Sequence, residues 1–278
     1  MNTTPLAHLS NALASPAQIQ HSHTRGISPT LVSSLHNLGA SVIQISCVLL
    51  KVSPDVAATA AILFHRFHLV VSFFDHNIRD TVAGAVYIAA KMRETELDGD
   101  DVLDAIDEAC QDPLAVGDTL APNRVNARKT KRTLYQTELE ILTTLSFDMQ
   151  VLTPYTFCLK YVSAIGIVSD ESRARVFQRA WNYMNDTMKT RIPILHQANT
   201  IAVTALWLAS REAGVELLDG EAWWQVFDVD SEDMGHAMLL LREGHEVAVR
   251  ERKRVEKGMI LGLTVDEVIK RVVEESSG

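Results

Sequence analysis

A short motif occurs twice in this chain, 120 residues apart, as AVYIAAK at 85–91 and ALWLASR at 205–211. In both copies alanine stands at the first and fifth positions, an aromatic residue at the third and a cation at the seventh. Small residues one helical turn apart let neighbouring helices approach closely. We therefore expect each copy to be the central helix of a bundle, with Ala85, Ala89, Ala205 and Ala209 buried at helix contacts.

The rest of the chain also favours helices. Thirteen glycines and eight prolines are few for 278 residues, and 47% of the residues are hydrophobic. The pairs Ser28-Pro29, Ser53-Pro54 and Thr153-Pro154 each place a capping hydroxyl before a proline suited to the first helical position. The same pairs are also open to proline-directed phosphorylation. The expected helices span about 29–50, 54–70, 75–93, 100–110 and 127–146, then about 154–165, 171–189, 197–213, 221–227 and 231–252, with a last piece near 264–275.

These segments predict an all-α protein with two tandem five-helix domains. The first domain is expected at 28–149 and the second at 150–256. Residues 1–27 are expected to form a flexible arm or at most a peripheral helix, and 257–278 a C-terminal extension. Residues 111–126 contain two prolines and a glycine and should form a surface loop.

Composition and motifs exclude several classes of protein. The net charge of -9 opposes broad attraction to a nucleic-acid backbone. We find no run of about 18 uncharged apolar residues that would cross a membrane. The three separated cysteines form neither a disulfide framework nor a zinc-ligand pair, which favours a reducing, intracellular compartment. Because the chain also lacks a phosphate loop, a nucleotide fingerprint and a nucleophile elbow, we expect no enzymatic activity and no cofactor.

Two clusters of possible metal ligands are better explained structurally. His65 and His68 share a helical face, with His76 eight residues further on, but they lie in the apolar run FHRFH without a carboxylate or cysteine at ligand spacing. The acidic stretch at 98–104 lacks the closing glutamate of a calcium loop, so its carboxylates suit a helix start instead. We expect no metal site.

Longer stretches of the sequence resemble the cyclin family. They are ATAAILFHRFH at 58–68, AVYIAAKMRE at 85–94 and TELEILTTLSFDMQVLTPYTF at 137–157. In the second half, AWNYMNDTMKT at 180–190 is similar to L-type cyclins, the group associated with transcription and pre-mRNA splicing. The resemblance implies two tandem cyclin-fold domains, the first of them the cyclin box. It also implies a nuclear regulatory subunit that binds and activates a cyclin-dependent kinase of the transcription or RNA-processing type, with a PITSLRE-type kinase as the expected partner.

The same resemblance implies which residues bind the kinase. Cyclins present a lysine at the end of the third helix and a glutamate on the fifth, which bind main-chain groups beside the kinase's regulatory helix. Here these residues are Lys91 and Glu138, and Met92, Leu142 and Phe147 would form the apolar part of the surface. Composition alone would make Lys91 and Glu138 a solvated pair, and the three apolar residues core.

The chain departs from the family pattern in three places. It reads Lys91-Met92-Arg93-Glu94 where many cyclins have two acidic residues after the lysine. The segment at 37–50 lacks the substrate-docking motif of cell-cycle cyclins, which favours the transcriptional branch. No Arg/Ser-rich stretch precedes the final residues at 275–278, although L-type cyclins commonly carry one.

An alternative function is that of a DNA-binding general transcription factor similar to transcription factor IIB. Such a protein would also have two repeats, but the acidic charge and the missing zinc ribbon speak against it.

Two basic clusters could contact acidic partners or a nuclear import receptor, or could be solvated helix faces. They consist of Arg128, Lys129, Lys131 and Arg132, and of Arg250, Arg252, Lys253 and Arg254.

Overall fold

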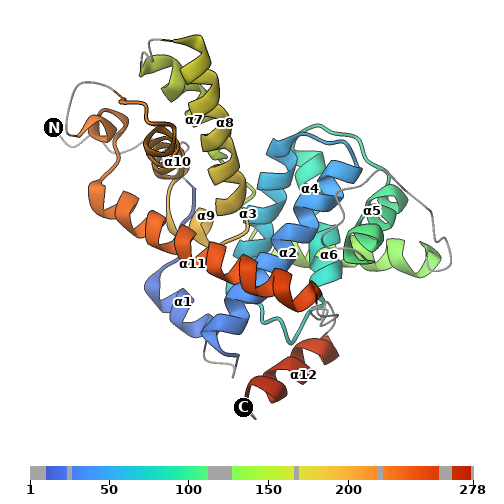
Figure 1. Cartoon of the computed structure of the whole chain (residues 1–278). Helices are drawn as coiled ribbons and strands as arrows, with labels where there is room; N and C mark the ends of the chain where they lie inside the picture. Colours follow the sequence, from blue (N-terminus) through green and yellow to red (C-terminus); the bar gives the residue numbers. More distant parts are fainter. Residues whose placement is uncertain are drawn as a thin grey trace. The chain divides into compact units, whose positions relative to one another are not determined.

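The computed structural model describes residues 11–23, 27–111, 127–165, 169–217, 222–256 and 265–276. Within these ranges the chain is helical and contains no strand (Figure 1). Packing contacts divide the chain into two compact units. We call Ala14–Met149 with Glu246–Gly278 the N-terminal unit, and Met1–Leu13 with Gln150–His245 the C-terminal unit.

The N-terminal unit is built around α4. It contains α1 (Pro16–His23), α2 (Pro29–Leu49), α3 (Pro54–Val70), α4 (Ile78–Met92), α5 (Gly99–Gln111), α6 (Ala127–Thr144), the end of α11 (Ser231–Glu256) and α12 (Val265–Ser276). Helix α4 packs against α2, α3, α5 and α6. Ala85 and Ala89 on this helix are completely buried. The prediction of a central, alanine-lined helix is therefore confirmed in the first half.

The C-terminal unit repeats this arrangement around α10. It contains α7 (Pro154–Ala164), α8 (Asp170–Thr187), α9 (Ile192–Leu195), α10 (Ala198–Ala213), the 3-10 helix η2 (Trp223–Phe227) and the first part of α11. Helix α10 packs against α7, α8, α9 and η2. Because Ala205 and Ala209 are buried as well, the internal repeat corresponds to two similar helical domains in tandem.

The three hydroxyl-proline pairs all begin helices, but only one hydroxyl caps its helix. The Ser28 Oγ accepts a 3.2 Å hydrogen bond from the Leu31 amide. Neither Ser53 nor Thr153 makes a side-chain cap bond, so the capping prediction was wrong at these two positions. At Ser53 the main-chain carbonyl accepts the Val56 amide at 3.0 Å and thus satisfies the group that a hydroxyl would have capped.

The described part of the expected N-terminal arm packs against other segments. Helix α1 contacts α3 in the N-terminal unit. Within the C-terminal unit, Asn11 is buried and exchanges hydrogen bonds of 2.8 to 3.0 Å with Leu152 and Gln197. The expected loop at 111–126 lies, apart from Gln111, outside the described residues.

Helix α2 meets the length and composition criteria for a membrane span, although the sequence analysis found no such stretch. It runs for 21 residues without Asp, Glu, Lys or Arg, and by length and composition it could cross a membrane. In the structure, however, 72% of the 18-residue window of α2 that meets these criteria is buried inside the protein. Gly39 on α2 lies so close to α3 that a Cβ atom there would overlap the Phe64 ring. We therefore interpret α2 as a core helix of the N-terminal unit.

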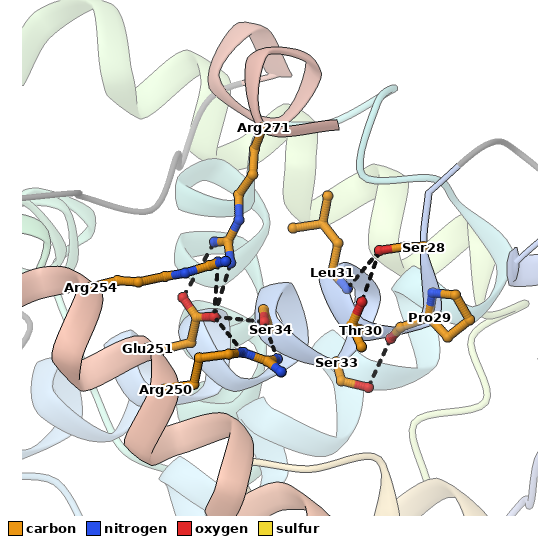
Figure 2. Close-up of polar contacts among 10 residues, drawn as sticks. All are labelled: Ser28, Pro29, Thr30, Leu31, Ser33, Ser34, Arg250, Glu251, Arg254 and Arg271. Carbon is orange, nitrogen blue, oxygen red and sulfur yellow. Dashed lines mark hydrogen bonds and ion pairs between the residues drawn. The ribbon is translucent and has the colours of Figure 1, made fainter. Parts of the chain in front are cut away.

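A buried carboxylate joins the end of α11 and α12 to α2 (Figure 2). Glu251 is 9% exposed, and its Oε1 accepts hydrogen bonds from Ser34 Oγ at 2.8 Å and from Arg271 Nη2 at 2.9 Å. Arg254 lies 3.3 Å from the same oxygen, and Arg250 donates to Ser34 Oγ at 3.1 Å. The basic cluster at 250–254 is therefore only in part a solvated face, because Arg250 and Arg254, whose side chains are 40% and 30% exposed, bond to groups of the N-terminal unit. We call these five residues the Glu251 cluster.

Candidate functional site

The site begins with a close approach between α4 and α6. Gly84 faces α6, and a Cβ atom at this position would lie 2.9 Å from Ile141 Cδ1 and 3.4 Å from the Glu138 amide nitrogen. Only a residue without a side chain leaves this space open. The contact brings the main chain of α6 at Glu138 against α4, so a long side chain one or two turns further along α4 can reach the Glu138 carboxylate.

Lys91 is that side chain. Its Nζ lies 2.6 Å from Glu138 Oε1, and the Lys91 side chain is 52% exposed whereas the Glu138 side chain is 16% exposed. The expected juxtaposition of these residues, which are 47 positions apart in the chain, is thus present. An ammonium group has three donors and a carboxylate has two acceptor oxygens. Each group can therefore bind a further partner without giving up the ion pair.

Two tyrosines that the sequence interpretation missed complete this polar cluster. The Lys91 Nζ lies 4.1 Å from the centre of the Tyr87 ring, one helical turn earlier on α4. The Tyr87 and Tyr135 ring centroids are 5.9 Å apart, and Tyr135 on α6 is 47% exposed. Burial, and then the Tyr135 ring and its hydrogen bond, raise the pKa of Tyr87. The signal was available, because the aromatic residue of the repeated motif stands four positions before its cation.

The predicted apolar residues lie near the ends of the same two helices. Met92 at the end of α4 and Leu142 on α6 are half-buried, whereas Phe147 is 63% exposed. Phe147 has a left-handed backbone with φ of 59°, and its amide donates to the Leu142 carbonyl at 2.8 Å. This bond closes the end of α6 and sets the Phe147 ring in solvent. Leu139 on α6 is also exposed, at 57%, and was not predicted.

Arg93, which stands where many cyclins carry an acidic residue, bonds to the start of α3. Its Nε lies 2.9 Å from Asp55 Oδ2, and its Nε and Nη2 lie 3.0 and 2.9 Å from Thr59 Oγ1. Glu94 follows with a left-handed φ of 53° and is exposed. Because Arg93 is engaged with α3, the exposed charge that follows Lys91 in the chain is the carboxylate of Glu94.

Of the three histidines considered as metal ligands, His65 and His68 belong to the core of the N-terminal unit, whereas His76 is half-exposed and its Nδ1 lies 3.4 Å from Glu140 Oε2. His65 is fully buried, and its Nδ1 lies 2.9 Å from His36 Nδ1. His68 stacks on Phe73 with ring centroids 3.9 Å apart, and burial lowers the pKa of His68 to about 3. Within the described ranges, no three His, Cys, Asp or Glu residues are arranged to hold a metal ion. We therefore interpret His65 and His68 as part of the aromatic packing of this core.

The acidic stretch at 98–104 and the buried cysteines have structural explanations. Lys131 binds Asp98 at 3.0 Å and Asp100 at 2.7 Å, so these carboxylates anchor the start of α5 to α6. Burial raises the pKa of Cys47 and that of Cys158 to about 12. Both thiols are therefore protonated at neutral pH and poor nucleophiles.

Comparison with known proteins supports the fold and relates the chain to one family. The family described as cyclin, N-terminal domain, matches residues 17–150. Cyclin-L1-1 of Oryza sativa subsp. japonica is 28% identical over 216 residues, which are 77% of this chain and 49% of that protein. The cyclin L homolog cyl-1 of Caenorhabditis elegans is 30% identical over 239 residues, 78% of this chain and 48% of that protein. The chain thus spans about half the length of these relatives.

A solved structure shows the same fold. A chain in the crystal structure of the yeast RNA Pol II CTD kinase CTDK-1 complex superposes with a TM-score of 0.63, covering 97% of this chain and 84% of that one. The sequences are 17% identical, so this likeness concerns the fold. Together with the family match over the N-terminal unit, it identifies the two tandem helical domains as cyclin folds.

Proposed function

The chain belongs to the cyclin family and resembles L-type cyclins, and on that premise we propose that it is the regulatory subunit of a cyclin-dependent protein kinase. In this proposal residues 28–149 form the cyclin box and 150–256 the C-terminal cyclin fold. The chain binds the kinase and switches it on, and the catalytic groups belong to the kinase.

The Lys91–Glu138 pair is the observation that carries the proposal. Its ammonium group, at the end of α4, and its carboxylate, on α6, lie 2.6 Å apart on two helices that are packed tightly at Gly84. A main-chain segment of the kinase offers carbonyl acceptors to the ammonium and amide donors to the carboxylate, and charge-assisted bonds of this kind are stronger than neutral ones. We propose that the kinase's regulatory helix is held in this way, which keeps its glutamate on the ATP-positioning lysine.

Apolar side chains near the ends of α4 and α6 support the same surface. We propose that Met92, Leu142 and Phe147 form its apolar part. Phe147 is 63% exposed, and Met92 and Leu142 are half-buried, so each of the three has apolar surface that a partner can cover. Aromatic side chains also supply a large share of the binding energy at protein interfaces.

The L-type resemblance supports a proposal about the type of kinase. Proteins similar to this chain over most of its length are named cyclin L in a plant and in a nematode. We propose that the chain works in the nucleus with a kinase of the transcription or RNA-processing type, and that a PITSLRE-type kinase is its partner.

The proposal is tested by mixing the purified chain with a panel of purified cyclin-dependent kinase catalytic subunits, PITSLRE-type kinases among them. One member should bind the chain and gain phosphate transfer to a peptide substrate, whereas the chain alone should transfer none. Lys91→Glu should abolish the stimulation while the variant stays folded. Absence of binding to every kinase in the panel would overturn the proposed function.

A further inference from the structure

We propose that Tyr87 is a positioning residue that orients Lys91 for kinase docking, an inference that rests on the proposed function. The Lys91 Nζ lies 4.1 Å from the centre of the Tyr87 ring and 2.6 Å from Glu138 Oε1. The ammonium group therefore has an aromatic face on one side and a carboxylate on the other. These two contacts restrict a side chain that is half exposed and that has four rotatable bonds.

The chemistry of the contact explains why an aromatic residue is needed. The face of a phenol ring carries partial negative charge and attracts an ammonium group. Unlike a second carboxylate, a ring accepts no strong hydrogen bond, so the N–H groups of Lys91 remain available for kinase carbonyls. An orientation that is fixed before binding also lowers the entropy lost when the side chain is immobilised in the complex.

The Tyr87 ring is supported by Tyr135. It lies on α6, three residues before Glu138, with its ring centroid 5.9 Å from that of Tyr87. Tyr87 is half-buried on α4, and Tyr135 is 47% exposed. The two helices that carry the ion pair therefore also carry the support beneath it.

The second copy of the motif provides a matched control. In the C-terminal unit, the guanidinium carbon of Arg211 lies 5.5 Å from the centre of the Trp207 ring, at the same four-residue spacing. Trp207 is half-buried like Tyr87, and Arg211 is exposed like Lys91. Removing either ring exposes a similar cation to solvent, but only Tyr87 lies beneath the proposed docking group.

The test is calorimetric titration of the kinase catalytic subunit that the panel identifies. Tyr87→Leu should weaken binding about 3- to 10-fold, the range expected when a partly exposed cation loses its aromatic face. Tyr87→Phe, which keeps the ring, should stay within about twofold of the wild type, and so should Trp207→Leu. In a Lys91→Met background, Tyr87→Leu should cause no further loss, because the lysine that the ring orients is absent.

A second readout does not need the kinase. The Lys91 ε-methylene protons should show an upfield ring-current shift in the NMR spectrum of the free chain, retained in Tyr87→Phe and lost in Tyr87→Leu. If Tyr87→Leu does not fold, the wild-type shift and the Tyr87→Phe titration decide the question. Absence of the shift in the wild type overturns the inference.

The outcomes also separate this inference from the proposed function. If Lys91→Met weakens kinase binding and Tyr87→Leu does not, the positioning role is wrong while the docking site stands. A loss of equal size in the Lys91→Met background makes Tyr87 an independent contact and also overturns positioning. If Lys91→Met leaves affinity unchanged, the docking site is misplaced and both proposals fall.

Discussion

Two of the ion-pair clusters in the N-terminal unit differ in burial. In the Glu251 cluster the carboxylate is 9% exposed and is surrounded by Ser34 and three arginines. In the Lys91–Glu138 pair the carboxylate side chain is 16% exposed, but its cation is 52% exposed and stands at a helix end, whereas the Arg271 side chain in the Glu251 cluster is 12% exposed. Charges taken out of water must be fully compensated inside the protein, whereas exposed pairs contribute little to stability. The difference indicates that the first cluster serves the fold and that the second is free to serve a partner.

The largest expected effect comes from breaking the Glu251 cluster. Glu251→Ala leaves Arg271, whose side chain is 12% exposed, without its carboxylate, so the free energy of unfolding should fall by about 3–5 kcal/mol. Denaturant titration followed by circular dichroism measures this change. Glu138→Ala is the control and should cost no more than about 1 kcal/mol. Equal losses in the two variants would remove the distinction between the clusters.

A smaller effect is expected from overpacking the helix that carries the exposed pair. Ala89→Leu and Ala209→Leu insert a large side chain at fully buried positions of α4 and α10, and each should cost about 1–3 kcal/mol. Only Ala89→Leu should also weaken kinase binding, because α4 carries Lys91. Thermal melts and kinase titrations of both variants provide the comparison. A similar loss of kinase affinity in Ala209→Leu would contradict the assignment of docking to α4.

Lowering the pH should reduce the stability of the fold through His68, a buried group that, unlike Glu251, has no opposite charge beside it. Burial lowers the pKa of His68 to about 3, from 6.5. The unfolded chain therefore binds a proton as pH falls below about 6.5 and the folded chain does not, so stability present above that pH is lost progressively towards pH 3. Between pH 7 and 5.5 the loss from His68 should be about 1 kcal/mol.

Denaturant titrations at the two pH values measure this loss, and His68→Phe should reduce the difference. The Phe ring keeps the stacking on Phe73 but cannot take up a proton. The variant should retain the pH dependence that comes from other groups, such as His196, whose pKa is also lowered, first by burial and then by His236. An unchanged pH dependence in His68→Phe would show that His68 is accessible to protons in the folded chain.

The smallest effect on stability is expected at the exposed pair itself. Lys91→Ala removes one exposed ion pair and one contact with a tyrosine ring, so the free energy of unfolding should change by no more than about 1 kcal/mol. Thermal melting in low and high salt is the measurement, since screening should reduce the small contribution further. A loss as large as that of Glu251→Ala would mean that the pair holds the fold together.

Local patterns in the sequence were enough to predict the helices and the buried alanines. Proline at the first helical position and apolar spacing are properties of neighbouring residues, so the starts of α2, α3 and α7 were predicted correctly. The four-residue helix α9 was missed because a single turn has no periodicity to detect. The start of α4 was placed a few residues too early for lack of a comparable signal.

Contacts between distant segments explain what the sequence could not predict. Arg250 and Arg254 look like a solvated face along α11, and only the folded chain shows that Ser34, more than 200 positions away, lies beside them. The adjacency of Lys91 and Glu138 was expected from the family resemblance and not from their spacing. The role of Tyr87 could have been inferred, because its distance from Lys91 is one helical turn.

The most direct test of the account is calorimetric titration of the identified kinase against Lys91→Glu, Glu138→Lys and the double swap. Each single variant should lose at least about 2–5 kcal/mol of binding free energy, since kinase main-chain groups would be left desolvated and unpaired. The double swap restores an ion pair between α4 and α6, so it should melt like the wild type. It reverses the donor and acceptor offered to the kinase, however, so it should bind the kinase as weakly as the single variants do. Wild-type affinity in both single variants would contradict the account, and so would full recovery of binding in the double swap.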